Sequence, residues 1–253
     1  MPEIQSRRDG SIVILTIANE PKRNAFSHDM TRQLGELLGE ADADKSVRCV
    51  IVTGAGDRAF SSGHDLNELL IHRDHAADDV LNEPFFKPQR MTTPTIAVVN
   101  GAAHAGGFIL ALSCDIRVCE PHADFAAPGA RIGLLPIGGQ LSRLPSLVPF
   151  GIAYEILATA RRVSATEAER FGFVNRIAET GNAMEVGLEI ARSIAANSAD
   201  VVVGIKKGLT IFAREGAEAA SQFEATEGRR LQGEPDADEG MQAFLQKRAP
   251  RFQ

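Results

Sequence analysis

An uncharged stretch near the middle of the chain constrains its fold more than any other feature. Residues 91–114, MTTPTIAVVNGAAHAGGFILALSC, contain no Asp, Glu, Lys or Arg. A membrane-spanning helix has a similar length, but Pro94, Asn100 and a pair of glycines interrupt the apolar run. We therefore expect a strand over 95–99 that is buried on both faces, followed by a buried helix after the glycine pair.

The same order of elements occurs on both sides of this stretch. A strand expected over 48–53 precedes the segment GAGDRAFSSGHDL, and strands expected over 115–119 and 123–127 follow the buried helix. This repetition predicts an α/β fold of β-β-α units stacked in a superhelix, and not a doubly wound sheet. Near the N-terminus, Asp9-Gly10 before the apolar segment 11–17 indicates a β-hairpin.

Helices are expected where capping residues precede apolar positions at helical spacing. Ser27 is a suitable cap, and Ser164 with Glu167 forms a capping-box pattern. Further segments are expected to be regular: helices over 140–147 and 150–160, a short strand over 174–177, and helices from residue 182 onward with breaks near Asn197, Gly216 and Glu234-Pro235. We divide the chain into a core, residues 1–180, and a helical C-terminal region, residues 181–253.

Charge and cysteine content limit the partners and the compartment. The net charge of -6 offers no basic surface for a phosphate backbone, so nucleic acid is not an expected partner. A membrane is not expected either, because the uncharged run is interrupted. No secretory signal is visible in MPEIQSRRDG. Cys49, Cys114 and Cys119 stand in apolar surroundings without metal spacing, which is typical of reduced thiols in a cytoplasmic protein.

Three other patterns are weaker indications of chemistry. Gly54-Ala55-Gly56 after a strand is similar to a dinucleotide fingerprint of an oxidoreductase, but neither the immediate helix nor the later acid follows. Ser61-Ser62-Gly63 lacks the turn of a serine hydrolase. The polar segment 72–83 is expected to be a mobile surface insert. It contains residues of types that can bind a metal, but a solvated charged surface is the better interpretation than a metal site; these residues are His72, Asp74, His75, Asp78 and Asp79.

Two glycine-bearing turns carry the strongest chemical signal. SSGHDL and HAGGF each follow an expected strand and precede a helix. A helix that starts in a glycine turn leaves free N–H groups at its positive end, so two neighbouring turns could hold one oxyanion. The alternative is that the glycines only permit tight packing of helix on sheet.

The segments VIVTGAGDRAFSSGHDLNEL, TPTIAVVNGAAHAGGFILALSCDIRV, ADFAAPGARIGLLPIGGQLSRL and EGMQAFLQKRAPRF together resemble the enoyl-CoA hydratase/isomerase (crotonase) family. The resemblance implies a β-β-α spiral core with a helical trimerisation region, a homotrimer or homohexamer, and acyl-CoA thioester substrates. It implies no metal, and no cofactor beyond the coenzyme A of the substrate.

Site residues carried over from this resemblance fall into two groups. The backbone N–H groups of His64 and Gly106 correspond to the oxyanion-hole donors that stabilise a thioester enolate. The acyl-CoA is expected to contact two segments; their implied binding residues are Lys22, Arg23, Asn24, Ala25, Ser62, Asp65, Leu66 and Asn67. Lys22 and Arg23 are placed near the phosphates, although plain solvent exposure is an equal alternative. Asp65 is expected to cap its helix and not to act as a base.

The departures from the family pattern concern the reaction. Hydratases of the family carry two glutamates, whose positions are occupied here by Ile109 and Gly129. Since neither residue can transfer a proton, we expect classical hydratase activity to be weak or absent. SSGHDL and AFLQKR are also similar to enoyl-CoA hydratase domain-containing proteins that lack the full acid pair.

Two other functions therefore remain open beside weak hydration. The GHD turn resembles the methylmalonyl-CoA decarboxylase branch, so His64 could serve a decarboxylase, thioesterase or isomerase acting on a CoA thioester. That branch also has a glutamate at the position of Ile109 and a tyrosine near Pro136, whereas the single tyrosine here is Tyr154. The last alternative is a non-catalytic CoA-thioester binder or scaffold.

Overall fold

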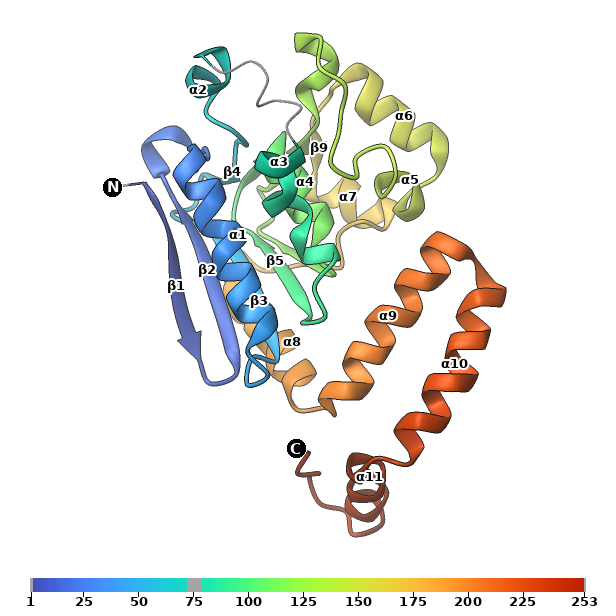
Figure 1. Ribbon diagram of the computed structural model, residues 1–253. Coiled ribbons are helices and arrows are strands. Elements are labelled where there is room, and N and C mark those ends of the chain that lie inside the picture. The colour runs from blue at the N-terminus through green and yellow to red at the C-terminus, as the bar shows by residue number, and fades with distance from the viewer. Residues whose placement is uncertain (1, 72–78, 253) are drawn as a thin grey trace.

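The computed structural model describes residues 2–71 and 79–252, in which two sheets are flanked by helices (Figure 1). The strands are β1 (Glu3–Asp9), β2 (Ile12–Ala18), β3 (Cys49–Gly54), β4 (Ala59–Ser61), β5 (Thr95–Val99), β6 (Ala102–His104), β7 (Ile116–Cys119), β8 (Asp124–Ala126), β9 (Val163–Ser164) and β10 (Arg176–Ile177). The expected hairpin is confirmed, because β1 and β2 pair antiparallel across Asp9 and Ile12.

Helices occupy most of the remaining described chain. They are α1 (His28–Ala43), α2 (Leu66–Ile71), α3 (Asp79–Phe86), α4 (Gly106–Ser113), α5 (Leu144–Leu147), α6 (Phe150–Thr159), α7 (Ala165–Phe171), α8 (Ala183–Ala195), α9 (Ala199–Glu215), α10 (Ala217–Gln232) and α11 (Pro235–Leu245), with 3-10 turns η1 (Glu20–Lys22), η3 (Lys87–Gln89) and η4 (Pro128–Ile132). Among the described helices, none is both long enough and apolar enough to cross a membrane.

The strand order makes the chain a spiral. Within the described residues, the larger sheet has the order β1-β2-β3-β5-β7-β10 and the smaller sheet the order β4-β6-β8-β9. Strands β3, β5 and β7 are parallel neighbours in one sheet, while β4, β6 and β8 are parallel neighbours in the other. Each unit therefore adds one strand to each sheet before a helical segment, which confirms the expected superhelix of β-β-α units.

The apolar strands are buried on both faces because helices cover the larger sheet from two sides. Val50 and Val52 of β3 belong to the main core, which also contains apolar side chains of α1 and α4. The alternate residues Cys49 and Ile51 pack in a second cluster with Leu188 of α8. This arrangement explains why β3 and β5 are apolar without a period-2 pattern.

The C-terminal helices follow the predicted breaks. Helix α8 lies against the larger sheet, whereas α9, α10 and α11 extend away from it (Figure 1). The chain turns between α9 and α10 at Gly216, whose φ is +90°. The division at residue 180 remains a prediction.

Two sequence expectations are wrong in this part of the molecule. The helix expected over 140–147 is only Leu144–Leu147 long. Pro145 has no N–H and is tolerated only in the first turn of a helix, so the helix begins at Leu144. The polar segment 72–83 was expected to be a surface insert, but its residues 79–83 belong to α3. Asn82 in this part is only 3% exposed.

Candidate active site

The two glycine turns predicted from the sequence lie in contact. The first joins β4 to α2 through Gly63, and the second joins β6 to α4 through Ala105 and Gly106. Gly63 has a φ of +88°, and a Cβ atom on it would lie 2.7 Å from the Gly106 nitrogen. Gly107 is equally restricted, since its Cβ would lie 2.2 Å from the Ser61 carbonyl oxygen. Glycine is therefore required for the approach of the two turns.

The start of α4 combines backbone strain with an open donor. Ala105 has φ 48° and ψ -118°, a region that L-residues rarely adopt, and its N–H donates to the Ala126 carbonyl over 3.0 Å. Gly106 is the first residue of α4, so its N–H has no acceptor within the helix. No backbone acceptor among the described residues takes this N–H.

His64 is held through both its backbone and its ring. The Phe26 N–H donates to the Gly63 carbonyl over 2.8 Å, and the Asp65 N–H donates to the Phe26 carbonyl over 2.9 Å. Because Phe26 bonds to the residues on either side of His64, the N–H and C=O of His64 itself point away from Phe26. The ring reaches α3, where its Nε2 lies 3.0 Å from Oδ1 of Asn82.

The two segments implied to contact coenzyme A are brought together. The Ser62 N–H donates to the Arg23 carbonyl over 3.0 Å. Lys22 forms an ion pair with Asp65, and the hydrogen bond between them raises the pKa of Lys22 and lowers that of Asp65. Asp65 also accepts the Asn67 N–H over 3.0 Å, so it caps α2 as expected.

The other implied contact residues differ in exposure. The amide of Asn24 is buried and donates to the carbonyls of Ala55 and Ala59 over 2.9 and 2.7 Å. Ala25 is also buried, whereas Leu66 is 63% exposed. Asn24 therefore acts on the backbone of this segment, and Leu66 offers an apolar surface on α2.

Close packing surrounds the positions of the two absent glutamates. Ile109 is 5% exposed and follows Gly106 by three residues, on the same side of α4. A Cβ on Gly138 would lie 2.7 Å from Cγ2 of Ile109, so the loop before α5 packs closely on this side chain. Gly129 is closed in as well, because its Cβ would lie 2.5 Å from the Leu134 carbonyl oxygen.

Two arginines bind the C-terminal end of α4, opposite Gly106. The sequence analysis did not predict this role for either of them. Arg117 donates to the carbonyls of Ala111 and Cys114 over 3.2 and 2.7 Å, and Arg143 donates to that of Cys114 over 3.1 Å. Burial, with a smaller effect of Arg143, lowers the pKa of Arg117 to about 10, so it stays charged at neutral pH. Cations at the C-terminus reinforce a helix dipole whose positive end is at Gly106.

Asn82 and Phe85 were also missed. They lie three residues apart on α3, and the ring of Phe85 contacts that of His64 edge-on, with centroids 4.8 Å apart. Their spacing of three residues is compatible with one face of a helix and could have indicated α3. The acidic residues before them led instead to the prediction of a polar surface insert. His72, Asp74, His75 and Asp78 lie outside the described residues.

The side chains of Tyr154 and His104 take no part in the contact between the two turns. Tyr154 is exposed on α6, where it stacks on Phe150 with ring centroids 6.2 Å apart. His104 forms a hydrogen bond with Asp124 on the neighbouring strand β8. The candidate acid–base side chain at the turns is therefore that of His64.

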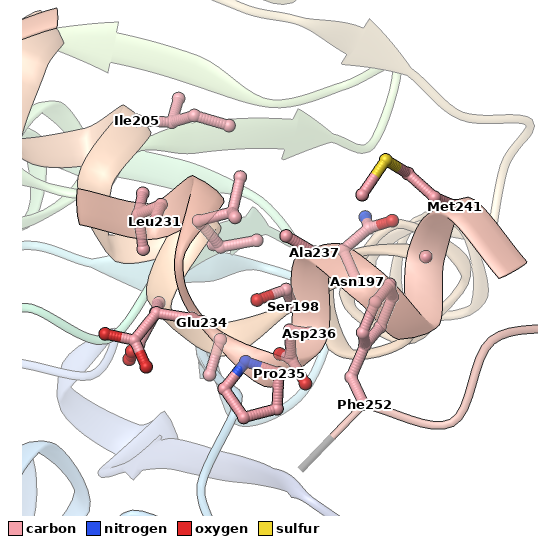
Figure 2. Close-up of a pocket in the computed structure, with 15 residues that line it drawn as sticks. Asn197, Ser198, Ile205, Leu231, Glu234, Pro235, Asp236, Ala237, Met241 and Phe252 are labelled. Carbon is pink, nitrogen blue, oxygen red and sulfur yellow. The ribbon is translucent and has the colours of Figure 1, made fainter. Parts of the chain in front are cut away.

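A cleft of about 710 Å³ lies elsewhere, among α9, α10 and α11 (Figure 2). Ile205, Leu231, Met241 and Phe252 are among the side chains that line it. No residue of either glycine turn lines this cleft. It therefore belongs to the C-terminal region and not to the candidate active site.

Comparison with known proteins agrees with this geometry. Residues 7–253 match the family model of enoyl-CoA hydratase/isomerase. The chain is 33% identical to the short-chain-enoyl-CoA hydratase of Clostridium acetobutylicum, over 95% of this chain and 94% of that protein. It is 36% identical to the carnitinyl-CoA dehydratase of Salmonella typhi, over 96% and 95%.

A solved structure extends the likeness to three dimensions. The enoyl-CoA hydratase of Mycobacterium tuberculosis matches with a TM-score of 0.90 at 31% identity, over 100% of this chain and 99% of that one. The family model, the relatives and this structure all span nearly the whole length. The chain belongs to the enoyl-CoA hydratase/isomerase family of CoA-thioester enzymes.

Proposed function

We propose that the protein binds an acyl-CoA thioester and stabilises its enolate with the backbone N–H groups of His64 and Gly106. The observation that carries this proposal is the contact between the two turns, in which Gly63 approaches the Gly106 nitrogen. The N-terminus of α4 adds positive potential at the same place. Donors aimed at a developing oxyanion each contribute about 10²- to 10³-fold to kcat.

Coenzyme A is proposed to lie along Lys22–Ala25 and Ser62–Asn67. The hydrogen bonds between these segments give one continuous strip beside the first turn. Lys22 and Arg23 are both exposed on this strip, which supports a place near the phosphates. Because Asp65 partly neutralises Lys22, Arg23 is the less compensated cation of the two.

Classical hydration of a 2-enoyl-CoA is proposed to be weak or absent. Hydration needs a group that activates water and a group that protonates the α-carbon. Ile109 and Gly129 supply neither, and a side chain at Gly129 would meet the Leu134 carbonyl oxygen.

A second candidate is decarboxylation, thioester hydrolysis or isomerisation that uses the imidazole of His64. The observation that supports it is the hydrogen bond between Nε2 of His64 and Asn82, which orients the imidazole ring of a residue in the first turn. Decarboxylation requires enolate stabilisation and a final protonation, but no base that removes a carbon-bound proton.

A substrate panel tests both candidates. The protein is incubated with enoyl-, 3-hydroxy-, malonyl- and methylmalonyl-CoA, and products are identified by mass spectrometry. His64→Ala is expected to abolish the product while CoA-thioester binding persists. His122→Ala serves as the matched control, because this histidine is exposed and its ring bonds to the Asp57 carbonyl, outside both turns.

The possible outcomes separate the alternatives. Binding without product across the panel would leave a scaffold and contradict the enolate proposal. Turnover of crotonyl-CoA at ordinary enzyme rates, unaffected by His64→Ala, would show that the chemistry lies elsewhere.

The protein is further proposed to form a homotrimer or homohexamer in the cytoplasm. Large apolar side chains are exposed on the C-terminal helices, namely Ile205, Leu209, Phe212, Met241, Phe244 and Leu245. Exposed apolar surface of this kind marks protein interfaces. Three buried thiols fit a reducing compartment. Sedimentation equilibrium decides the assembly, and a monomer at micromolar concentration would contradict it.

A further inference from the structure

Helix α3 touches both glycine turns through two side chains on one face. Oδ1 of Asn82 lies 3.0 Å from Nε2 of His64 in the first turn. Phe85 packs edge-on against the same ring at an interplanar angle of 74°, and a Cβ on Gly106 in the second turn would lie 3.2 Å from its Cε1 atom. The helix therefore contacts both the ring of His64 and the start of α4 at Gly106.

Both side chains are enclosed by the core. Asn82 and Phe85 are buried, and Phe85 also packs edge-on against Phe26 with ring centroids 4.8 Å apart. A buried amide is stable only when its polar atoms are hydrogen-bonded, so the contact with His64 contributes to the position of α3 as well as to that of the ring.

The chemistry of the amide selects one form of the imidazole. An amide oxygen only accepts hydrogen bonds, so the ring nitrogen that faces it carries a proton. With Oδ1 of Asn82 as its acceptor, a neutral His64 ring would donate from Nε2 and hold its lone pair on Nδ1. Within a histidine, Nδ1 is the ring nitrogen nearer the backbone, so Nδ1 of His64 lies on the side of the first glycine turn.

We propose that Asn82 is a positioning residue that holds His64 as the Nε2–H tautomer, so that Nδ1 exchanges a proton with the thioester. The inference rests on the proposed enolate chemistry and adds the residue that selects the reactive nitrogen. The protonated ring gives its Nδ1 proton to the α-carbon, where the enolate electron pair forms the new C–H bond. The neutral ring that remains keeps its other proton on Nε2, bonded to Asn82.

The tautomer is measured directly in the full-length protein. Nitrogen NMR of protein labelled with ¹⁵N-histidine distinguishes protonated from unprotonated ring nitrogens, and loss of signals in His64→Gln identifies those of His64. We expect the neutral ring to carry its proton on Nε2. A proton on Nδ1 in the wild-type protein would overturn the proposal without any variant at Asn82.

Two variants at Asn82 separate positioning from general stability. Asn82→Leu has a similar volume but no acceptor, and both tautomers of His64 are expected to appear in its spectrum. Asn82→Asp keeps an acceptor oxygen and is expected to restore the Nε2–H form. Glu83→Gln, at the next residue of α3, is the matched control and should leave the spectrum unchanged.

Kinetics at one fixed pH give the second readout. With the thioester that the wild-type protein turns over, Asn82→Leu is expected to lower kcat about 10-fold with little change in KM, and Asn82→Asp to recover part of it. If no thioester is turned over, the proposed function fails while the spectrum still decides the role of Asn82. An unchanged tautomer in folded Asn82→Leu, verified by circular dichroism, would refute the inference whatever the activity.

Discussion

Gly63 and Gly106 bring the two turns together through backbone atoms alone. Any side chain on Gly63 would collide with the Gly106 nitrogen, which is a proposed donor. The adjacent Ala105 adopts a strained conformation that the surrounding strands maintain. At the scale of single residues, the contact between the turns therefore depends on two glycines, which have no side chain, and on the unusual backbone conformation of Ala105.

Gly63→Ala should lower both stability and activity. The new Cβ would lie 2.7 Å from a backbone nitrogen, and the φ of +88° adds strain. Gly181→Ala is the matched control, because Gly181 has a φ of +85° and nothing within 4 Å of its Cβ.

The control is expected to lose about 1 kcal/mol of unfolding free energy from strain alone. Gly63→Ala should lose about 2 kcal/mol more and lower kcat/KM about 100-fold. Urea titration and steady-state kinetics measure the difference. Equal losses in the two variants would mean that the contact between the turns is unimportant.

Restoring one glutamate should not restore hydration. Ile109→Glu places a carboxylate at a position that is 5% exposed, packed against the loop at Gly138. We expect a loss of about 3 kcal/mol in unfolding free energy at pH 7, because a buried carboxylate lacks a partner there.

Crotonyl-CoA hydration by Ile109→Glu should stay within about threefold of the wild-type rate, since single catalytic groups act as part of a set. Gly129 still provides no second acid. A spectrophotometric assay of crotonyl-CoA measures this rate. A gain of about 100-fold would show that one glutamate is enough in this framework.

At the scale of elements, α4 and α9 are held at defined ends. Arg117 and Arg143 bind the C-terminal carbonyls of α4, which leaves its N-terminus for the proposed oxyanion. Helix α9 is joined to the core by Lys206, whose Nζ donates to the Pro88 and Thr93 carbonyls over 3.0 Å each. Lys206 also forms an ion pair with Asp115 at 2.8 Å.

Lys206→Met should detach α9 from the core. It removes three hydrogen-bonded contacts of a side chain that is 12% exposed, with an expected cost of about 3 kcal/mol. Lys207→Met is the control, because Lys207 lies over the Phe223 ring within the α9–α10 pair and contributes about 0.5 kcal/mol. Chemical denaturation compares the two, and similar midpoints would contradict this role of Lys206.

At the scale of the whole molecule, the buried thiols make the folded state less stable at alkaline pH. Cys49, Cys114 and Cys119 are buried, and desolvation raises the pKa of each thiol from its ordinary value to about 12. The unfolded chain releases these protons at lower pH than the folded chain. Stability is therefore retained below pH 9 and falls as the pH rises from about 9 toward 12.

Each thiol contributes a slope of about 1.4 kcal/mol per pH unit in that window, so three together give about 4. Urea denaturation between pH 8 and 11 measures the slope in wild type and in Cys49→Ala. The variant should show a slope smaller by one thiol. A thiol reagent should react with the unfolded chain and not with the native one at pH 8, and rapid native labelling would contradict the burial argument.

The amino-acid sequence alone was enough to predict the spiral, the hairpin, the capping box at Ser164 and the breaks between the C-terminal helices. These features depend on local preferences, such as the burial of uncharged strands and the turn conformations of glycine. The family resemblance added the two candidate donors and the two absent glutamates. Pairing of the glycine turns could be expected because parallel neighbouring strands end at the same edge.

Only the tertiary structure decided how the site is supported. Asn82 reaches His64 from a segment whose acidic composition suggested a solvated insert, and Leu134 closes the space at Gly129. Arg117 and Arg143 bind α4 from different parts of the chain. Such contacts join residues distant in sequence, and their formation depends on the register and packing of whole elements, which no local pattern encodes.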